Sequence, residues 1–243
     1  MTILITGGSK GIGRAIAEEF ATDGTDVFIN YHNDDNAAKE AAEAVQSAGS
    51  TPHLIKGSVA TPDGARAVLA EVALRTERLD QLVHAAVDPL AGTAMEMDAD
   101  RFTDAVRLNG LGLLYVTQAA SPLLGNGSTV FFLSSRGSSV VVPNYSALGA
   151  SKALGESLVR YLGKELAPRG IRVNTVSAGP LDTAAIRAVI PNAEERLAAA
   201  AAANPSGRGL EFSDVTKTVR WLSSGDAPMV QGQLVFVDGG LYL

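Results

Sequence analysis

The 243-residue sequence has no cysteine and only three histidines, His32, His53 and His84. The absence of cysteine excludes disulfide bonds, thiolate metal sites and a cysteine nucleophile. The histidines do not follow the HxxxH-type spacing of a metal site, so we expect no bound metal. Positive charge is also scarce, because 20 Lys and Arg stand against 26 Asp and Glu, for a formal net charge of −6. Without a basic stripe, nucleic acid is not an expected partner.

Long apolar runs are missing as well. The sequence holds no stretch of roughly 18 apolar residues, the length that a membrane-spanning helix needs. Met1 leads directly into a short apolar strand rather than into a signal peptide. Hydrophobic residues nevertheless make up 46% of the chain, enough to bury one large core. We therefore expect a soluble, cytoplasmic protein, not bound to membranes, in which residues 1–243 form a single domain.

Short runs rich in β-branched residues alternate with longer, alanine-rich segments of helical pattern. This alternation is typical of a parallel sheet with helices on both faces. Right-handed crossovers between the strands give an α/β, doubly wound Rossmann fold with a seven-stranded parallel sheet. The predicted strands are Thr2–Thr6, Asp26–Tyr31, Thr51–Lys56, Gln81–Ala85, Thr129–Leu133, Arg172–Val176 and Leu234–Val237. The predicted helices are Gly11–Thr22, Asn36–Ala48, Ala65–Thr76, Asp100–Leu124, Tyr145–Leu166 and Val215–Leu222.

One segment, Ile186–Ala203, is biased in composition, because it ends in the alanine run Ala198–Ala203 before Asn204-Pro205. Alanine favours helix, so one interpretation is a surface helix. The segment also follows the carboxyl end of a predicted strand, where ligands bind in open α/β sheets. The other interpretation is therefore a substrate lid, which we place at residues 183–210.

A glycine-rich loop, Thr6-Gly7-Gly8-Ser9-Lys10-Gly11-Ile12-Gly13, joins the first predicted strand to the first predicted helix. Glycines in this strand–turn–helix context allow a tight turn and let backbone N–H groups approach a pyrophosphate at the helix N-terminus. A tight turn without a ligand is the alternative. We interpret the loop as a dinucleotide site and expect Gly7, Ser9, Lys10, Gly11, Ile12 and Gly13 to contact the cofactor.

The end of the second predicted strand bears on the choice between NADPH and NADH. An acidic residue there accepts hydrogen bonds from the ribose 2′-hydroxyl of NAD. This chain has Asn30-Tyr31-His32-Asn33 instead, and Lys10 and Arg14 can reach toward a 2′-phosphate. Asp34 and Asp35 follow closely, and these acidic residues favour NADH instead. We expect NADPH rather than NADH, with Asn30 and Tyr31 among the cofactor contacts.

These motifs, taken in order, resemble the short-chain dehydrogenase/reductase superfamily along essentially the whole chain. The residues that carry the resemblance are Thr6-Gly7-x3-Gly11-x-Gly13, Asn109, Ser135, Lys152, Arg172-Val173-Asn174 and Val237-Asp238-Gly239-Gly240. Within the superfamily, the chain is similar to the enoyl-acyl-carrier-protein reductases, whose signature is Tyr-x6-Lys. That likeness rests on Pro143-Asn144-Tyr145-x6-Lys152-Ala153, on Ser177-Ala178-Gly179-Pro180-Leu181-Asp182-Thr183, and on His84 in Val83-His84-Ala85-Ala86.

The resemblance implies roles for further residues. Lys152 would hold the nicotinamide ribose, and Thr183, after Pro180, would meet the nicotinamide carboxamide. Ser58-Val59 stands where an Asp commonly meets the adenine, and Ala85 lies in the stretch that follows the fourth strand. A homotetramer is the assembly that the resemblance implies.

The Tyr145–Lys152 pair differs from the spacing of the superfamily's carbonyl reductases, in which Tyr precedes Lys by four residues; here Leu148 occupies that position. Residues i and i+7 of a helix lie about 20° apart in projection and about 10 Å apart along the axis, on one face. In ketone reduction, the acid must reach the oxygen beside the carbon that accepts hydride. In an α,β-unsaturated thioester the oxygen lies two carbons farther away, so a donor one turn along the helix can meet it.

Two other polar residues are candidates for the site. Ser135 follows the predicted strand Thr129–Leu133 at the edge where Rossmann sites form, and either donates to the substrate or is only a polar strand end. Many enoyl reductases carry a second aromatic residue at this position. Asn109 lies within a predicted apolar helix, where its amide must find partners. It either holds a proton-relay water or is a satisfied core amide.

Three hypotheses follow. The first is an NADPH-dependent enoyl-thioester reductase, in which Tyr145 stabilises the enolate of an acyl chain carried by acyl carrier protein or coenzyme A. The second is an NADPH-dependent ketoreductase for a polyketide or other carbonyl substrate, in which Ser135 polarises the carbonyl group. The third is a catalytically silent NADPH-binding sensor, since Leu148 replaces the usual acid.

Overall fold

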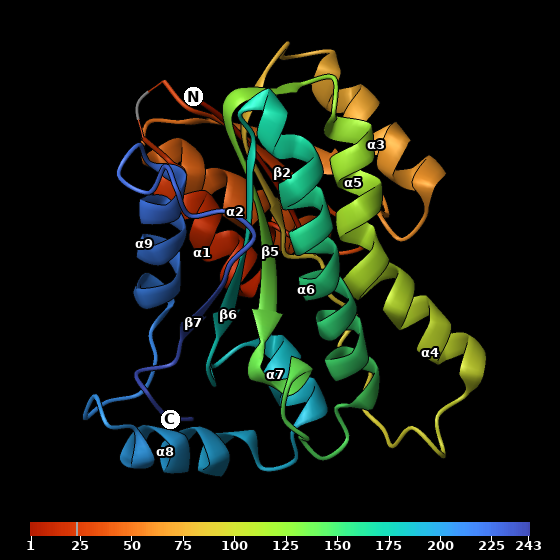
Figure 1. Ribbon diagram of the computed structural model, residues 1–243, viewed down its shortest axis with the longest axis vertical. Coiled ribbons are helices and arrows are strands. Elements are labelled where there is room, and N and C mark those ends of the chain that lie inside the picture. Colours follow the sequence, from red (N-terminus) through yellow and green to blue (C-terminus); the bar gives the residue numbers. More distant parts are fainter. Residues whose placement is uncertain (23) are drawn as a thin grey trace.

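The strands form one parallel sheet in the order β3-β2-β1-β4-β5-β6-β7 (Figure 1). The computed structural model describes residues 1–22 and 24–243. The order reverses between β1 and β4, and in open α/β sheets ligands bind at the carboxyl ends of the strands beside such a reversal. The predicted fold class is confirmed. The strands are β1 (Thr2–Thr6), β2 (Asp26–Tyr31), β3 (Thr51–Lys56), β4 (Leu79–His84), β5 (Leu124–Ser135), β6 (Arg172–Ala178) and β7 (Leu234–Val237).

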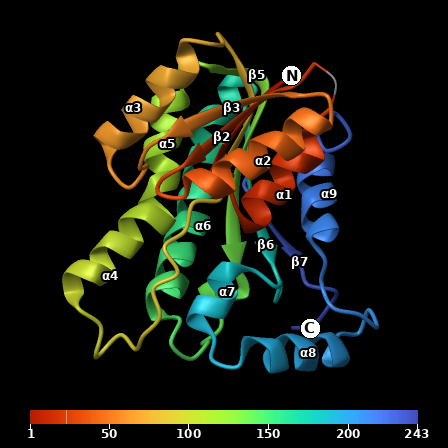
Figure 2. The same cartoon turned by 180° about the vertical axis from the view of Figure 1, so that it is seen from behind.

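Alternate residues of the central strands face opposite layers of helices. Leu4 and Phe132 belong to a buried cluster on one face, whereas Ile5 and Phe131 belong to a second cluster on the other. Each fully buried side chain of this kind contributes about 1.5–3 kcal/mol. Figures 1 and 2 show the two layers from opposite sides. The first face is covered by α3 (Pro62–Ala73), α5 (Gly112–Ala120) and α6 (Ser146–Leu166), and the second by α1 (Gly11–Phe20), α2 (Asp35–Ser47) and α9 (Phe212–Ser223).

The bounds of β1, β2, β3 and β7 agree with the prediction, whereas β5 is longer than predicted. Leu124, which was expected to end a helix, pairs with Leu79 in the sheet. The preceding helix has already ended at Ala120. The hydroxyl of Ser128 donates to the Leu79 carbonyl across 2.6 Å and joins the start of β5 to β4.

The prediction of one continuous helix over Asp100–Leu124 is wrong. The segment contains α4 (Ala99–Val106), a π-helical turn at Arg107–Leu111, and α5. A π-helical turn accommodates one extra residue in the helix and is frequent at functional sites. Its buried members are Asn109 and Gly110.

The segment predicted as a helix or lid at Ile186–Ala203 forms two helices, α7 (Ala184–Val189) and α8 (Ala193–Ala203). Pro191 and the left-handed conformation of Asn192, with a φ of 54°, separate them. Both helices lie across the end of the sheet toward which the strands point (Figure 1). The segment therefore has the position that the lid interpretation requires.

None of the helices in residues 1–22 and 24–243 combines the length and apolar character needed to cross a bilayer. The same residues contain no cluster of three or more acidic, His or Cys side chains suited to a metal ion.

We expect Gly155→Ala to destabilise the fold. A Cβ at Gly155 of α6 would lie 2.2 Å from Cζ of Phe132 in β5. Overpacking of this kind costs about 1–3 kcal/mol and works against a helix-propensity gain of about 1 kcal/mol. Urea unfolding should show a net loss of up to about 2 kcal/mol. The control is Gly163→Ala on the same helix, where the nearest atom would be 3.4 Å away, and an equal loss in both variants would contradict the prediction.

Candidate active site

The carboxyl end of β5 holds the two residues of the predicted catalytic pair. The Lys152 ammonium donates to the Leu133 carbonyl across 2.7 Å, and the hydroxyls of Ser135 and Tyr145 are hydrogen bonded, with Oγ and Oη 3.0 Å apart. Lys152 is on α6, which packs against this strand. The structure thus brings three of the four predicted catalytic residues together at the edge of the sheet.

Tyr145 does not lie on the helix, contrary to the prediction. Helix α6 begins at Ser146, and Tyr145 is the residue before it, with φ −113° and ψ 14°. Leu148, at the position where carbonyl reductases carry their Tyr, is buried. The phenol is therefore placed by the loops around it and not by the periodicity of the helix.

Two loops hold Tyr145 in position. Asn144 has a φ of 59°, a left-handed conformation that is uncommon outside glycine. Its carbonyl accepts from the Gly92 N–H across 3.0 Å, and Gly92 forms a parallel bridge with Tyr145. Ser146 then donates to the Gly92 carbonyl across 2.9 Å. Gly137 provides the surface under the ring, since a Cβ there would be 2.6 Å from Cδ1 of Tyr145.

Sequence reasoning did not find these supporting residues. Asn is enriched among left-handed residues, which is a weak signal for Asn144. The roles of Gly92 and Gly137 depend on contacts between segments far apart along the chain, and nothing local in the sequence indicates them.

Burial shifts the pKa of both members of the pair. Burial raises the pKa of Tyr145 above its usual value of 10.0, while the hydrogen bond with Ser135 acts in the opposite direction. Burial lowers the pKa of Lys152 to about 8, and the Glu156 carboxylate partly opposes that shift. At neutral pH the site therefore combines a protonated phenol with a charged ammonium. This pairing suits the stabilisation of an oxyanion.

The Asn109 side chain is fully engaged in the π-helical turn. Its Oδ1 accepts from the Asp88 N–H across 2.7 Å, and its Nδ2 donates to the Asp88 carbonyl across 3.1 Å. These contacts match the core-amide interpretation of Asn109. They fix the loop that follows β4 rather than reaching the Tyr145–Lys152 pair.

His84 at the end of β4 has a structural contact on each ring nitrogen. Nε2 donates to the Leu108 carbonyl across 3.0 Å, and Nδ1 lies 2.8 Å from the Thr6 hydroxyl. Burial first, and then the charge of Lys152, lower the pKa of His84 to about 3. His84 is therefore a neutral link between β1, β4 and the π-helical turn.

The glycine-rich loop forms a cradle at the reversal between β1 and β4. Gly7 has a φ of 67°, and a Cβ there would lie 2.6 Å from Cα of Ala86. A Cβ at Gly13 would lie 2.3 Å from the Gly7 carbonyl oxygen. The N-terminus of α1 begins inside this turn, at Gly11. The turn therefore needs glycine to pack this closely, and the helix N-terminus to which it leads suits a pyrophosphate, so the loop fits a dinucleotide.

Other predicted cofactor residues surround this cradle in different ways. The Asn30 amide donates to the carbonyls of Ile55 and Gly57, so it fixes the strand end instead of facing outward.

Val59 is buried in the core behind α3, while Ser58 accepts from the Ala60 N–H across 3.3 Å. The Ala85 N–H donates to the Thr6 carbonyl across 3.0 Å, beside the loop. Tyr31 ends β2 near Lys56, whose ammonium lies 5.9 Å from the ring centre.

The two cations expected to meet a 2′-phosphate already have acidic partners. Lys10 pairs with Asp34 at 2.5 Å, and Arg14 pairs with Glu18 at 2.8 Å and with Glu40 at 3.4 Å. Both cations are at the surface, where ion pairs contribute about 0–1 kcal/mol and exchange readily. A phosphate would therefore replace a carboxylate at these side chains.

Thr183 lies beside the cofactor loop. A Cβ at Gly11 would be 3.7 Å from Cγ2 of Thr183, although the two residues are far apart in sequence. The Thr183 hydroxyl accepts from the Ile186 N–H across 3.1 Å and caps α7. A cavity of about 310 Å³ lies between Pro180, this helix and α8.

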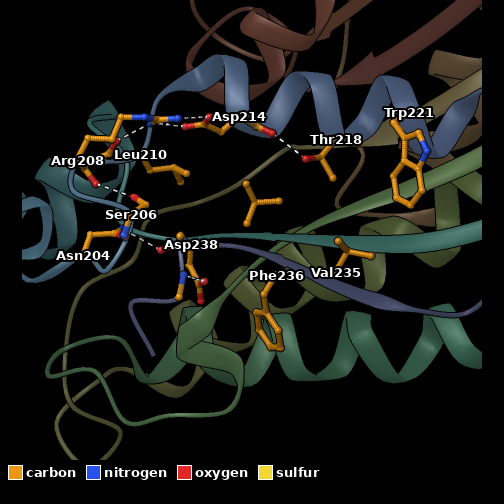
Figure 3. A pocket seen from close by; sticks show the side chains of 14 residues that line it. Asn204, Ser206, Arg208, Leu210, Asp214, Thr218, Trp221, Val235, Phe236 and Asp238 are labelled. Atoms are coloured by element: carbon orange, nitrogen blue, oxygen red, sulfur yellow. Dashed lines mark hydrogen bonds and ion pairs between the residues drawn. The ribbon is translucent and has the colours of Figure 1, made fainter. Parts of the chain in front are cut away.

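A larger hollow of about 450 Å³ lies at the β7 edge of the sheet, away from the catalytic pair. Figure 3 shows Thr218 and Trp221 of α9 on one side and Val235 of β7 on the other. Asn204 closes one end by donating to the Asp238 carbonyl across 2.9 Å. This hollow lacks Ser135, Tyr145 and Lys152, so it is not the catalytic site.

Comparison with known proteins gives a consistent result. Residues 7–242 match the protein family described as Enoyl-(Acyl carrier protein) reductase. The chain is 33% identical over 240 residues to the 1-cyclohexenylcarbonyl-CoA reductase of Streptomyces collinus, covering 98% of this chain and 85% of that protein. It is 31% identical over 242 residues to the 3-oxoacyl-(acyl-carrier-protein) reductase FabG of Staphylococcus aureus strain Mu50, covering 99% and 97%.

The fold is shared with a solved structure that holds a nicotinamide cofactor. A short-chain dehydrogenase from Burkholderia cenocepacia J2315, in complex with NADP, superposes with a TM-score of 0.90 at 29% identity. The superposition covers 99% of this chain and 97% of that one.

We expect Ser135→Ala to raise the pKa of Tyr145 further. The hydrogen bond with Ser135 lowers the pKa of the phenol, and its removal leaves burial as the dominant influence. An ultraviolet difference titration against a matched Tyr145→Phe background isolates this phenol from the other tyrosines. Ser139→Ala, an exposed change in the same region, is the control. A Tyr145 titration unchanged by Ser135→Ala would contradict the contact.

Proposed function

Because the chain belongs to the enoyl-(acyl carrier protein) reductase family of short-chain dehydrogenases/reductases, we propose that it reduces the C=C bond of an α,β-unsaturated acyl thioester with NADPH. The observation that carries this proposal is the position of Tyr145. Its phenol meets Ser135 at the end of β5, while the position used by carbonyl reductases is filled by the buried Leu148. Family membership alone identifies the protein as an NAD(P)H-dependent oxidoreductase.

The residues of the site have separable roles in this reaction. NADPH, when bound, supplies the hydride that adds to the β-carbon of the substrate. Tyr145 would hydrogen bond to the thioester oxygen, where the negative charge develops, and donate its proton there to give the enol. The enol would then become the saturated thioester as its α-carbon takes a proton from water and its oxygen loses one, and the Tyr145 phenolate would regain its proton from water. Lys152 adds a positive charge nearby and holds the nicotinamide ribose. Thr183, beside the cofactor loop, orients the nicotinamide ring.

The cradle at Gly7 and Gly13 supports a pyrophosphate at the N-terminus of α1. Preference for NADPH is supported by the absence of an acid at the end of β2 and by Lys10 at the mouth of the loop. The Burkholderia relative, which was solved with NADP, is consistent with this choice.

Residues 183–210 would act as the substrate lid. Helices α7 and α8 lie across the carboxyl end of the sheet, and Thr183 begins the segment beside the cofactor loop. Closure of such a segment excludes water from the reacting atoms. Ile186 and Ile190, which are partly exposed, supply apolar surface for an acyl chain.

A ketoreductase is the second candidate, because Ser135 keeps its hydroxyl beside the Tyr145 phenol. The same pair can bind a carbonyl oxygen directly. The Staphylococcus relative, whose name gives a 3-oxoacyl substrate, favours this alternative.

We expect Tyr145→Phe to abolish reduction of crotonyl thioesters. Losing the proton donor should lower kcat by about a hundredfold or more. Oxidation of NADPH is followed by its absorbance with crotonyl- and acetoacetyl-thioesters in parallel, and Tyr161→Phe, exposed on α6, is the control. Turnover of acetoacetyl substrates alone would replace the proposal with the ketoreductase. NADPH binding without any turnover would favour the sensor.

We expect Lys10→Ala to weaken the binding of NADPH but not that of NADH. Loss of one charge-assisted contact with the 2′-phosphate should raise the Kd of NADPH about tenfold and leave that of NADH almost unchanged. Nucleotide fluorescence gives both constants, and Lys39→Ala, exposed on α2, is the control. Equal effects on the two nucleotides would show that Lys10 does not recognise the phosphate.

A further inference from the structure

Glu156 follows Lys152 by one turn of α6 and takes no part in the proposed reaction. It is half-buried, and its carboxylate accepts a hydrogen bond from the Ser134 hydroxyl of β5. Ser134 directly follows Leu133, whose carbonyl accepts from Lys152. Adjacent residues at the end of one strand therefore hold both a cation and an anion of the same helix.

The surroundings of the Lys152 ammonium contain little else that stabilises charge. Besides the Leu133 carbonyl, the Phe132 ring lies beneath it, with its centre 4.8 Å from Nζ. A buried ammonium without a counter-charge tends to lose its proton. In the described part of the chain, the ionisable groups around it are Glu156 on α6, His84 on β4 and Tyr145 before the helix. At neutral pH the last two are neutral, which leaves Glu156 as the anion.

The neighbouring face of β6 is also polar. Ser177 pairs in register with Ser134, and Thr175 lies two residues before it on the same face of the sheet. Both hydroxyls are buried and have no hydrogen-bond partner among the residues that the structure describes. Neither hydroxyl therefore donates to Glu156, and in the described part of the chain its carboxylate is held by the Ser134 hydroxyl.

We infer that Glu156 is a positioning residue for Lys152, whose carboxylate, anchored by Ser134, keeps the buried ammonium charged at the end of β5. The inference rests on the proposed function for its consequence, because a charged Lys152 is what would hold the ribose and favour the oxyanion. It adds a carboxylate and a serine to the machinery of the site. Glu156 acts through Lys152 and does not touch the reacting atoms.

The first test needs neither cofactor nor substrate. The pKa of Lys152 is about 8 in the folded chain and 10.5 as an ordinary value, so the unfolded chain binds the proton more tightly between these pH values. Stability should therefore rise with pH across that window. In Glu156→Gln, which removes the charge at similar size, the rise should begin about one pH unit lower. The free energy of unfolding, measured in urea between about pH 7 and 11, gives this shift.

Two comparisons make the test specific. Glu165→Gln, exposed on the same helix, should follow the wild-type curve. In a Lys152→Met background, Glu156→Gln should no longer change the pH dependence, because the titrating group is gone. Superimposable curves for Glu156→Gln and Glu165→Gln, or a shift that persists without Lys152, would overturn the inference.

The second test follows NADPH binding and turnover against pH. At alkaline pH, loss of the Lys152 charge should reduce both NADPH binding and turnover. In Glu156→Gln, this alkaline decline should occur at a pH about one unit lower. Glu156→Asp, which restores the charge, should recover most of the shift, whereas a purely structural role would lower activity at every pH alike. An unmoved limb would overturn the inference. If no thioester is reduced at all, the proposed function fails, while the unfolding curves still decide the role of Glu156.

Discussion

The burial of one ammonium group is the constraint on which the site depends. Lys152 has left water for a position between a backbone carbonyl and an aromatic ring, and this transfer is unfavourable for a lone charge. Everything around it compensates for that cost. β5 extends far enough to present the Leu133 carbonyl, Ser134 holds a carboxylate one turn away, and Ser135 holds the phenol. Three consecutive residues of one strand thus organise two residues of one helix and the residue at its N-terminal cap.

The cofactor region uses charge differently. Its cations lie at the surface and are paired with acids beside the loop. Because surface pairs are weak, a phosphate can replace the acids at little cost. Lys152 is buried and fixed, whereas Lys10 and Arg14 form ion pairs at the surface that exchange readily. One edge of the sheet therefore carries both a fixed cation and exchangeable ones.

Local patterns in the sequence were sufficient for the sheet and its order of elements. Short runs rich in β-branched residues predicted β1, β2 and β3 to the residue, and the glycine-rich loop lies where its motif placed it. The errors arose where a segment's conformation depends on distant partners. The π-helical turn satisfies Asn109 through Asp88, and Tyr145 leaves the helix because Gly92 bridges to it. The ion pair between Lys10 and Asp34 was likewise not predicted from the sequence. The lid, the homotetramer and the preference for NADPH stay predictions.

The bridge between Gly92 and Tyr145 has an evolutionary consequence. The loop after β4 lies at the edge of the sheet where substrates bind, and such loops change readily as a lineage acquires new substrates. Here that loop also anchors Tyr145, through Gly92, Asn144 and Ser146. An insertion that reshapes the loop therefore also moves the phenol. In descendants of this chain, the shape of the loop and the position of Tyr145 are inherited together, so divergence requires compensating changes on both sides of the bridge.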